Sequence, residues 1–84
     1  MLTIRFFSMI RESLDREEMT LDWDEGLVDI NAVKQTLVDA NGEHWREVLF
    51  QGNLLHALNQ RVVRPEHPVT DGDEIAFFPP MTGG

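Results

Sequence analysis

The last stretch of the chain restricts the fold more than any other part of the sequence. It consists of Phe77-Phe78, Pro79-Pro80, Met81-Thr82 and Gly83-Gly84. Proline fixes φ and has no backbone N–H, so a strand that holds the two phenylalanines must end before the prolines. The diproline favours an extended backbone close to polyproline II, and glycine keeps the end of the segment narrow. We therefore predict a folded domain over residues 1–78 and an extended tail over residues 79–84.

The tail has two interpretations. Six residues from Pro79 to Gly84 can span about 20 Å, which is enough to enter a narrow channel in another protein. The Gly84 carboxylate would be presented there. A carboxylate is a poor electrophile, but adenylation by ATP gives it a leaving group that sulfur or an amine can displace. The alternative is a loose chain end without a function, because glycine is common in such ends.

Length and composition limit the class of protein. A chain of 84 residues forms one domain, and the lack of cysteine excludes disulfides, thiolate metal sites and a cysteine nucleophile. The net charge of −8 repels a phosphate backbone, so we expect no nucleic-acid partner. The same charge favours either solubility or attraction to a basic protein surface. No apolar run approaches about 18 residues, so we expect a cytoplasmic protein without a membrane partner.

Hydrophobic periodicity predicts most of the secondary structure. In the first strand Leu2, Ile4 and Phe6 share one face, and Phe7 is an apolar residue on the polar face. The predicted elements are a strand over residues 2–7, a short helix over 8–14 capped by Ser8, a strand over 17–23, a main helix over 30–40 capped by Asp29, a helical turn over 43–50, short strands over 54–59 and 60–63, and a last strand over 74–78.

The order of these elements indicates the fold class. Strand, strand, helix and then more strands is not the alternation of a doubly wound sheet, so we predict an α+β fold in which one main helix crosses a mixed sheet. The first and last strands are expected side by side and parallel at the centre. This is the β-grasp arrangement of ubiquitin, with the tail leaving the end of a central strand.

Side chains that could carry chemistry are scattered. The spacing of His44, His56 and His67 matches no helical metal pair, and no cysteine supports a site. Carboxylate runs such as Glu17-Glu18 favour turn and surface roles over acid–base catalysis. Gly72 stands alone, so no phosphate loop is predicted. We therefore expect no bound metal or cofactor.

Three apolar residues are predicted to face away from the main helix. Phe7, Val62 and Phe78 are expected to form one patch on the free face of the sheet. An apolar patch on a small protein commonly marks a partner site. The alternative is that short helices or loops cover these side chains.

Two parts of the sequence resemble the small subunit of molybdopterin synthase, the MoaD family of ubiquitin-like proteins. The strongest part is Leu58-Asn59-Gln60 followed by the run from His67 through Phe77-Phe78-Pro79-Pro80 to Gly83-Gly84. The opening Phe6-Phe7 and Ile10-Arg11-Glu12 are similar to the same family. The resemblance extends over nearly the whole chain.

The resemblance implies a ubiquitin-like β-grasp fold and a sulfur-carrier function. An adenylating enzyme would use ATP to activate Gly84, and a sulfurtransferase or cysteine desulfurase would supply sulfur for a thiocarboxylate. That group would donate sulfur to cyclic pyranopterin monophosphate, twice per molybdopterin dithiolene, in a heterotetramer with the large subunit. The small subunit would be a non-catalytic sulfur donor of this transferase, with the catalytic side chains on the large subunit. Gly83 would support threading, and the partner-binding residues would be Phe7, Val62, Phe78, Pro79, Pro80, Met81 and Thr82.

Three other functions stay open. The related sulfur carrier for thiamine thiazole synthesis shares the fold and the Gly-Gly end, although the run Phe77-Phe78-Pro79-Pro80 argues against it. A ubiquitin-like protein modifier would use the same activated carboxylate to acylate amines. An interaction module with an inert tail would use only the apolar patch.

Overall fold

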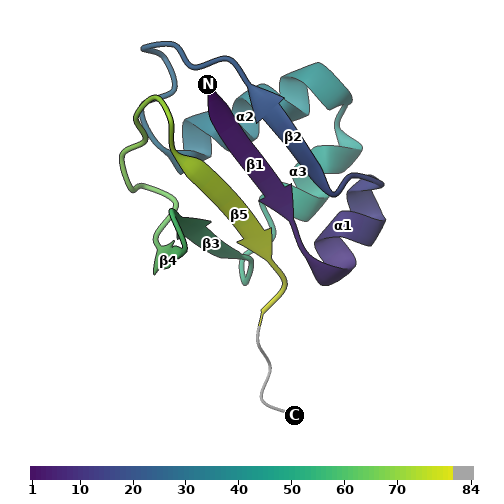
Figure 1. Ribbon diagram of the computed structural model, residues 1–84. Helices are drawn as coiled ribbons and strands as arrows, with labels where there is room; N and C mark the ends of the chain where they lie inside the picture. Colours follow the sequence, from purple (N-terminus) through teal and green to yellow (C-terminus); the bar gives the residue numbers. More distant parts are fainter. Residues whose placement is uncertain (81–84) are drawn as a thin grey trace.

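The computed structural model describes residues 1–80 of the chain. Three helices and five strands follow one another along the sequence (Figure 1). Their bounds are β1 (Leu2–Phe6), α1 (Ser8–Leu14), β2 (Glu18–Leu21), α2 (Ile30–Asn41), α3 (His44–Leu49), β3 (Leu55–Leu58), β4 (Arg61–Val63) and β5 (Glu74–Phe78).

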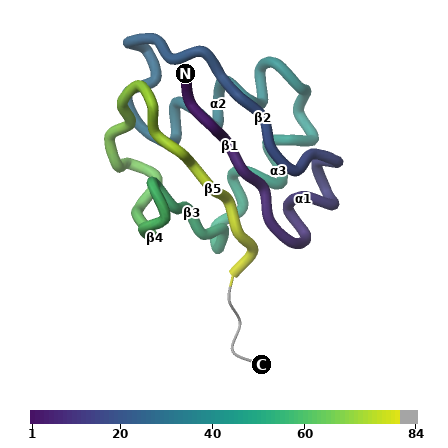
Figure 2. The backbone as a smooth tube through the Cα atoms, viewed as in Figure 1, coloured from purple at the N-terminus to yellow at the C-terminus, as the bar shows by residue number. Residues whose placement is uncertain are grey.

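The five strands form one mixed sheet in the order β2-β1-β5-β3-β4. β1 and β5 are parallel neighbours at the centre, and the other neighbours are antiparallel. Figure 2 follows these two strands side by side, running from the end that holds the N-terminus toward the end where β5 stops. Helices α2 and α3 cover one face, and α1 lies beside α3 (Figure 1). The predicted ubiquitin-like β-grasp arrangement is confirmed.

The core lies between the sheet and α2 because the strands alternate. In β1, residues Leu2, Ile4 and Phe6 are buried, and in β5 the same is true of Ile75 and Phe77. The Phe6 ring stacks on the Phe77 ring with a centroid distance of 5.8 Å. Burial of large apolar side chains is the main stabilising contribution in a domain of this size.

Helix α2 begins at the predicted Asp29 cap and ends one residue after the predicted range 30–40. The Asp29 side chain accepts a hydrogen bond of 2.8 Å from the Ala32 amide, which satisfies one of the free N–H groups of the first turn. The helix ends before Gly42, whose φ of 114° suits a residue without a Cβ. Ile30, Val33 and Leu37 form the buried stripe.

Two local predictions are wrong. Ser8 does not cap α1, because the N-cap position belongs to Phe7 and Ser8 is the first helical residue with a φ of 52°. The Phe7 amide still donates to the Phe77 carbonyl (3.2 Å), so the chain stays paired to β5 up to the residue before the helix. The second strand is also shorter than the predicted range 17–23. It ends at Leu21 because Leu21 pairs with Leu2, the first residue of β1.

Candidate functional site

The free-face patch consists of Phe7, Val62 and Phe78, and the structure brings these three residues together. Parallel pairing places Phe6 opposite Phe77, so the next residues on both strands also meet. The Phe7 and Phe78 rings stack with a centroid distance of 4.7 Å and an interplanar angle of 9°. Stacked aromatic pairs of this kind present a rigid apolar surface.

A shallow hollow of about 260 Å³ lies between these rings and Val62. Its floor is formed by the small side chains of Ala57 and Ala76, which are paired across β3 and β5. Val62 stands on the short β4 strand and is 72% exposed. Helices α2 and α3 lie on the other face of the sheet (Figure 1), and Phe7 and Phe78 are half-buried. Within residues 1–80 neither helices nor loops therefore cover the patch completely.

Arg5 adds a charged group to the rim of the patch. Its guanidinium lies 5.3 Å from the Phe7 ring centroid and forms ion pairs with Glu18 (3.7 Å) and Glu74 (3.9 Å). These contacts hold the cation over the aromatic face, an arrangement that favours attraction to the ring. We did not predict Arg5 as a site residue, although alternation along β1 places it on the same face as Phe7.

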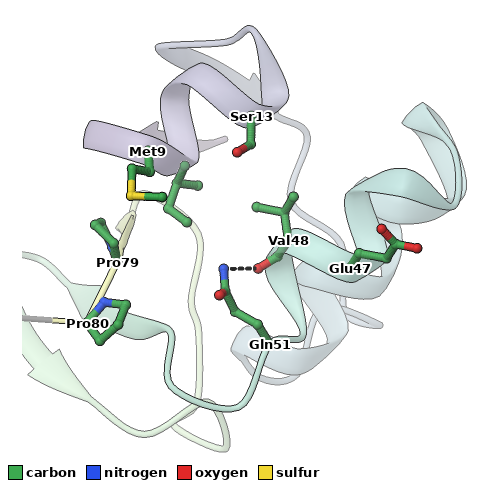
Figure 3. Close-up of a pocket in the computed structure, with 8 residues that line it drawn as sticks. Met9, Ser13, Glu47, Val48, Gln51, Pro79 and Pro80 are labelled. Carbon is green, nitrogen blue, oxygen red and sulfur yellow. Dashed lines mark hydrogen bonds between the residues drawn. The ribbon is translucent and has the colours of Figure 1, made fainter.

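Pro79 and Pro80 line a different hollow, which lies between the end of β5 and the helices α1 and α3. This tail-root hollow is also lined by Met9 of α1 and by Val48 and Gln51 at the end of α3, and its volume is about 450 Å³. Figure 3 shows Met9 and both prolines on one side and Val48 and Gln51 on the other. We did not predict Met9 as part of a site, because its exposure beside the prolines depends on how α1 packs against α3.

The remaining predicted site residues, Met81, Thr82, Gly83 and Gly84, lie outside the described residues. Their roles and the domain boundary at residue 78 stay predictions. The structure does fix where β5 ends. Phe78 is its last residue, at the end of the sheet opposite to the N-terminus (Figure 1).

A buried pair of ionisable side chains lies on the helix-covered side of the sheet. Lys34 Nζ is 2.9 Å from His56 Nε2 and 4.5 Å from the centroid of the Phe50 ring. Burial lowers the pKa of His56 to about 4, an effect to which the Lys34 charge adds and which Glu66 opposes. Burial also lowers the pKa of Lys34, again against Glu66. The imidazole is thus neutral at pH 7 and accepts a hydrogen bond from Lys34.

This pair does not belong to the free-face patch. The His56 ring packs edge-on against the core residue Phe77, with a centroid distance of 5.8 Å.

Over residues 1–80 no three histidine, cysteine, aspartate or glutamate side chains gather in a way that could hold a metal ion. No helix in the described part of the chain is long and apolar enough to span a membrane.

Sequence comparison identifies the family. A sequence model described as the ThiS family matches residues 4–84. The chain belongs to the ThiS family. This ThiS-family chain is 41% identical over 86 residues to the molybdopterin synthase sulfur carrier subunit of Escherichia coli strain K12, with 100% of both chains covered.

Solved structures agree with the fold of this ThiS-family chain. The small archaeal modifier protein 1 from Methanosarcina acetivorans superposes with a TM-score of 0.75 at 21% identity, covering 99% of this chain and 95% of that one. A second neighbour comes from a complex of subunits 1 and 2 of the molybdopterin-converting factor from Helicobacter pylori 26695. It has a TM-score of 0.63 at 25% identity and covers 99% of this chain and 97% of that one.

Proposed function

We propose that this chain is the sulfur-carrier subunit of a molybdopterin synthase. The observation that carries the proposal is the 41% identity to the Escherichia coli sulfur carrier subunit, which extends over 100% of both chains. The fold supports it in a second way. The free-face patch offers a docking surface next to the end of β5, from which the chain continues toward Gly84.

The proposed chemistry takes place on the Gly84 carboxylate. A carboxylate oxygen attacks the α-phosphorus of ATP in the adenylating enzyme, and pyrophosphate leaves. The terminal sulfur of a persulfide on a sulfurtransferase or cysteine desulfurase then attacks the acyl carbon and displaces AMP, which gives an acyl disulfide. A thiol cleaves the S–S bond of this acyl disulfide, so that the thiocarboxylate is released and the thiol is oxidised to a disulfide. In the large subunit the thiocarboxylate sulfur forms a bond to a carbon of cyclic pyranopterin monophosphate, and a C–O bond of the pterin breaks so that one oxygen substituent leaves as water. The product is a thioester between Gly84 and the pterin sulfur. Water then releases the Gly84 carboxylate, and a second donation completes the dithiolene.

The chain's own contribution is binding and delivery. In the part of the chain that the structure describes, the apolar free-face patch is built from rigid, stacked rings with a charged rim. Such aromatic anchors commonly dominate the binding energy of an interface. We propose that the patch docks on the large subunit, with Gly83 and Gly84 entering that subunit's active site. The neighbour from Helicobacter pylori, described as a complex of subunits 1 and 2, supports this assignment.

The first test is the mass of the intact protein. The protein is incubated with the adenylating enzyme, ATP and a sulfide source, and its mass is compared with that of an untreated sample. We expect a gain equal to the exchange of one oxygen for sulfur, located on Gly84 by fragmentation. A variant that lacks Gly84 serves as the matched control and should remain unchanged. Absence of the gain, or sulfur on another residue, contradicts the proposal.

The second test separates the sulfur-carrier functions from each other. The thiocarboxylated protein is offered to the large subunit with the pterin precursor, and in parallel to the sulfur-accepting enzyme of thiazole synthesis. We expect molybdopterin in the first reaction and no product in the second. Thiazole formation would favour the related carrier, and isopeptide adducts on other proteins would favour a modifier.

A further inference from the structure

We propose that the tail-root hollow is a second contact site for the large subunit, and that it receives an apolar side chain flanked by a basic one. The inference rests on the proposed function, because it uses Gly84 as the group that reacts inside that subunit. It concerns a surface separate from the free-face patch. The hollow at the free-face patch and the tail-root hollow share no lining residue.

The shape and lining of the hollow fit an entering apolar side chain. The space of about 450 Å³ is bounded by the prolines, by Met9 and by Val48 (Figure 3). Met9 is 66% exposed, which makes it one of the most exposed large apolar side chains in the described part of the chain. Its unbranched thioether can adopt several conformations and adapt to the shape of a partner.

The short span between Pro80 and Gly84 requires the large subunit to lie close to this hollow. Four residues follow Pro80 up to and including Gly84, and four residues span at most about 14 Å. An active site that acts on Gly84 must therefore lie within about 14 Å of Pro80. A protein large enough to enclose such a site also covers the surface around Pro80, and the tail-root hollow opens there.

The charge of the residues that line the hollow indicates that the partner's apolar side chain is flanked by a basic one. Glu47 is the charged residue among those that line the hollow in the described part of the chain. The whole chain carries a net charge of −8, so a basic side chain on the partner is attracted from a distance and meets a carboxylate at the rim. Gln51 is held by a hydrogen bond of 2.9 Å from its Nε2 to the Val48 carbonyl, which keeps this wall in place.

A matched pair of substitutions tests the apolar part. Met9→Arg places a cation where the partner's basic group is expected and removes the apolar contact. Val28→Arg is the control, because Val28 is similarly exposed at 63% but lies in the loop between β2 and α2, at the end of the sheet away from the end of β5 (Figure 1). We expect Met9→Arg to raise the Kd for the isolated large subunit about tenfold or more, and Val28→Arg to change it less than about twofold. Thermal melting of both variants should match the parent.

A second pair tests the charged part. Glu47→Arg should raise the same Kd about tenfold, whereas Glu25→Arg, an equal charge change in the loop before α2, should have a much smaller effect. If the parent binds and Met9→Arg binds equally well, the hollow is not a contact and the inference is overturned. An equal loss of affinity in both variants of a pair also overturns the inference, because the loss then depends on the net charge of the chain and not on the position of the substitution. If the parent itself does not bind, the proposed function fails instead.

Discussion

The sequence holds two adjacent phenylalanines near each end, and in each case one ring lies in the core and its neighbour lies on the free face of the sheet. Phe6 and Phe77 stack inside the core, with their rings inclined by 21°, whereas Phe7 and Phe78 stack on the free face, with their rings inclined by 9°. One parallel register between β1 and β5 creates both pairs. Position along the strand, and not the type of side chain, therefore decides which pair supports the fold and which is available to a partner.

The largest expected effect comes from breaking the inner pair. Phe77→Ala leaves a cavity beneath α2 and should lower the free energy of unfolding by about 3–5 kcal/mol, a large part of the stability of a small domain. Chemical denaturation with urea measures this change. An unchanged midpoint would show that Phe77 is not a core residue and that the assignment of the two faces is reversed.

Acid should weaken the fold through the buried His56 on the inner side of the sheet. The pKa of His56 is about 4 in the folded protein, below the ordinary value of 6.5, so between these values the unfolded chain binds a proton that the folded chain does not. This contribution to stability is complete above about pH 6.5 and is lost as the pH falls to about 4. The loss should be at most about 3 kcal/mol.

The variant His56→Gln is the control for this effect. Glutamine does not ionise and still offers an acceptor to Lys34 Nζ, so its unfolding free energy should fall less steeply between pH 6.5 and 4 than that of the parent. Urea denaturation across this range measures both slopes. Equal slopes would show that the imidazole titrates as it does in the unfolded chain.

Breaking the outer pair should affect binding more than folding. Phe78→Ala removes one of the two stacked rings of the free-face patch and should weaken binding to the large subunit by about 2 kcal/mol or more. Its effect on unfolding should be clearly smaller than that of Phe77→Ala, because Phe78 is only half-buried. Calorimetric titration with the large subunit measures the affinity. A variant that binds as tightly as the parent would remove Phe78 from the interface.

The smallest effect is expected from the rim of the outer pair. Arg5→Met removes the cation above Phe7 and the ion pairs with Glu18 and Glu74, but these groups are at least partly exposed to solvent, which screens the ion pairs. The free energy of unfolding should change by less than about 1 kcal/mol. Arg61→Met, at an exposed position on β4, is the matched control. A much larger loss for Arg5→Met would mean that the free-face patch depends on Arg5 for its shape.

The fold and the free-face patch could be predicted because both depend on alternation along single strands. The period of two in β1 and β5 places Phe6 and Phe77 inside and Phe7 and Phe78 outside without further information. The Ser8 cap prediction failed because a capping signal is local, whereas the bond from the Phe7 amide to Phe77 joins distant parts of the chain. The contact between Lys34 and His56 was not predicted for the same reason, since 22 positions separate the two residues.

The tail-root hollow could not be predicted from any one segment. Its walls come from α1, from the end of α3 and from the two prolines, so it exists only after three parts of the chain have packed together. The roles of Met81, Thr82, Gly83 and Gly84 come from the family resemblance and remain to be tested by the mass and reconstitution experiments.

The parallel pairing of β1 and β5 has a mechanical consequence. The two strands lie side by side and run in the same direction, so Leu2 and Phe78 stand at opposite ends of the central pair. A force that pulls on the end of β5 while the start of β1 is held acts along the strands and loads their hydrogen bonds together, in shear. The bonds cannot open one after another, as they would in a peeled hairpin. Tension applied to the end of β5 would therefore be resisted by the whole β1–β5 ladder at once.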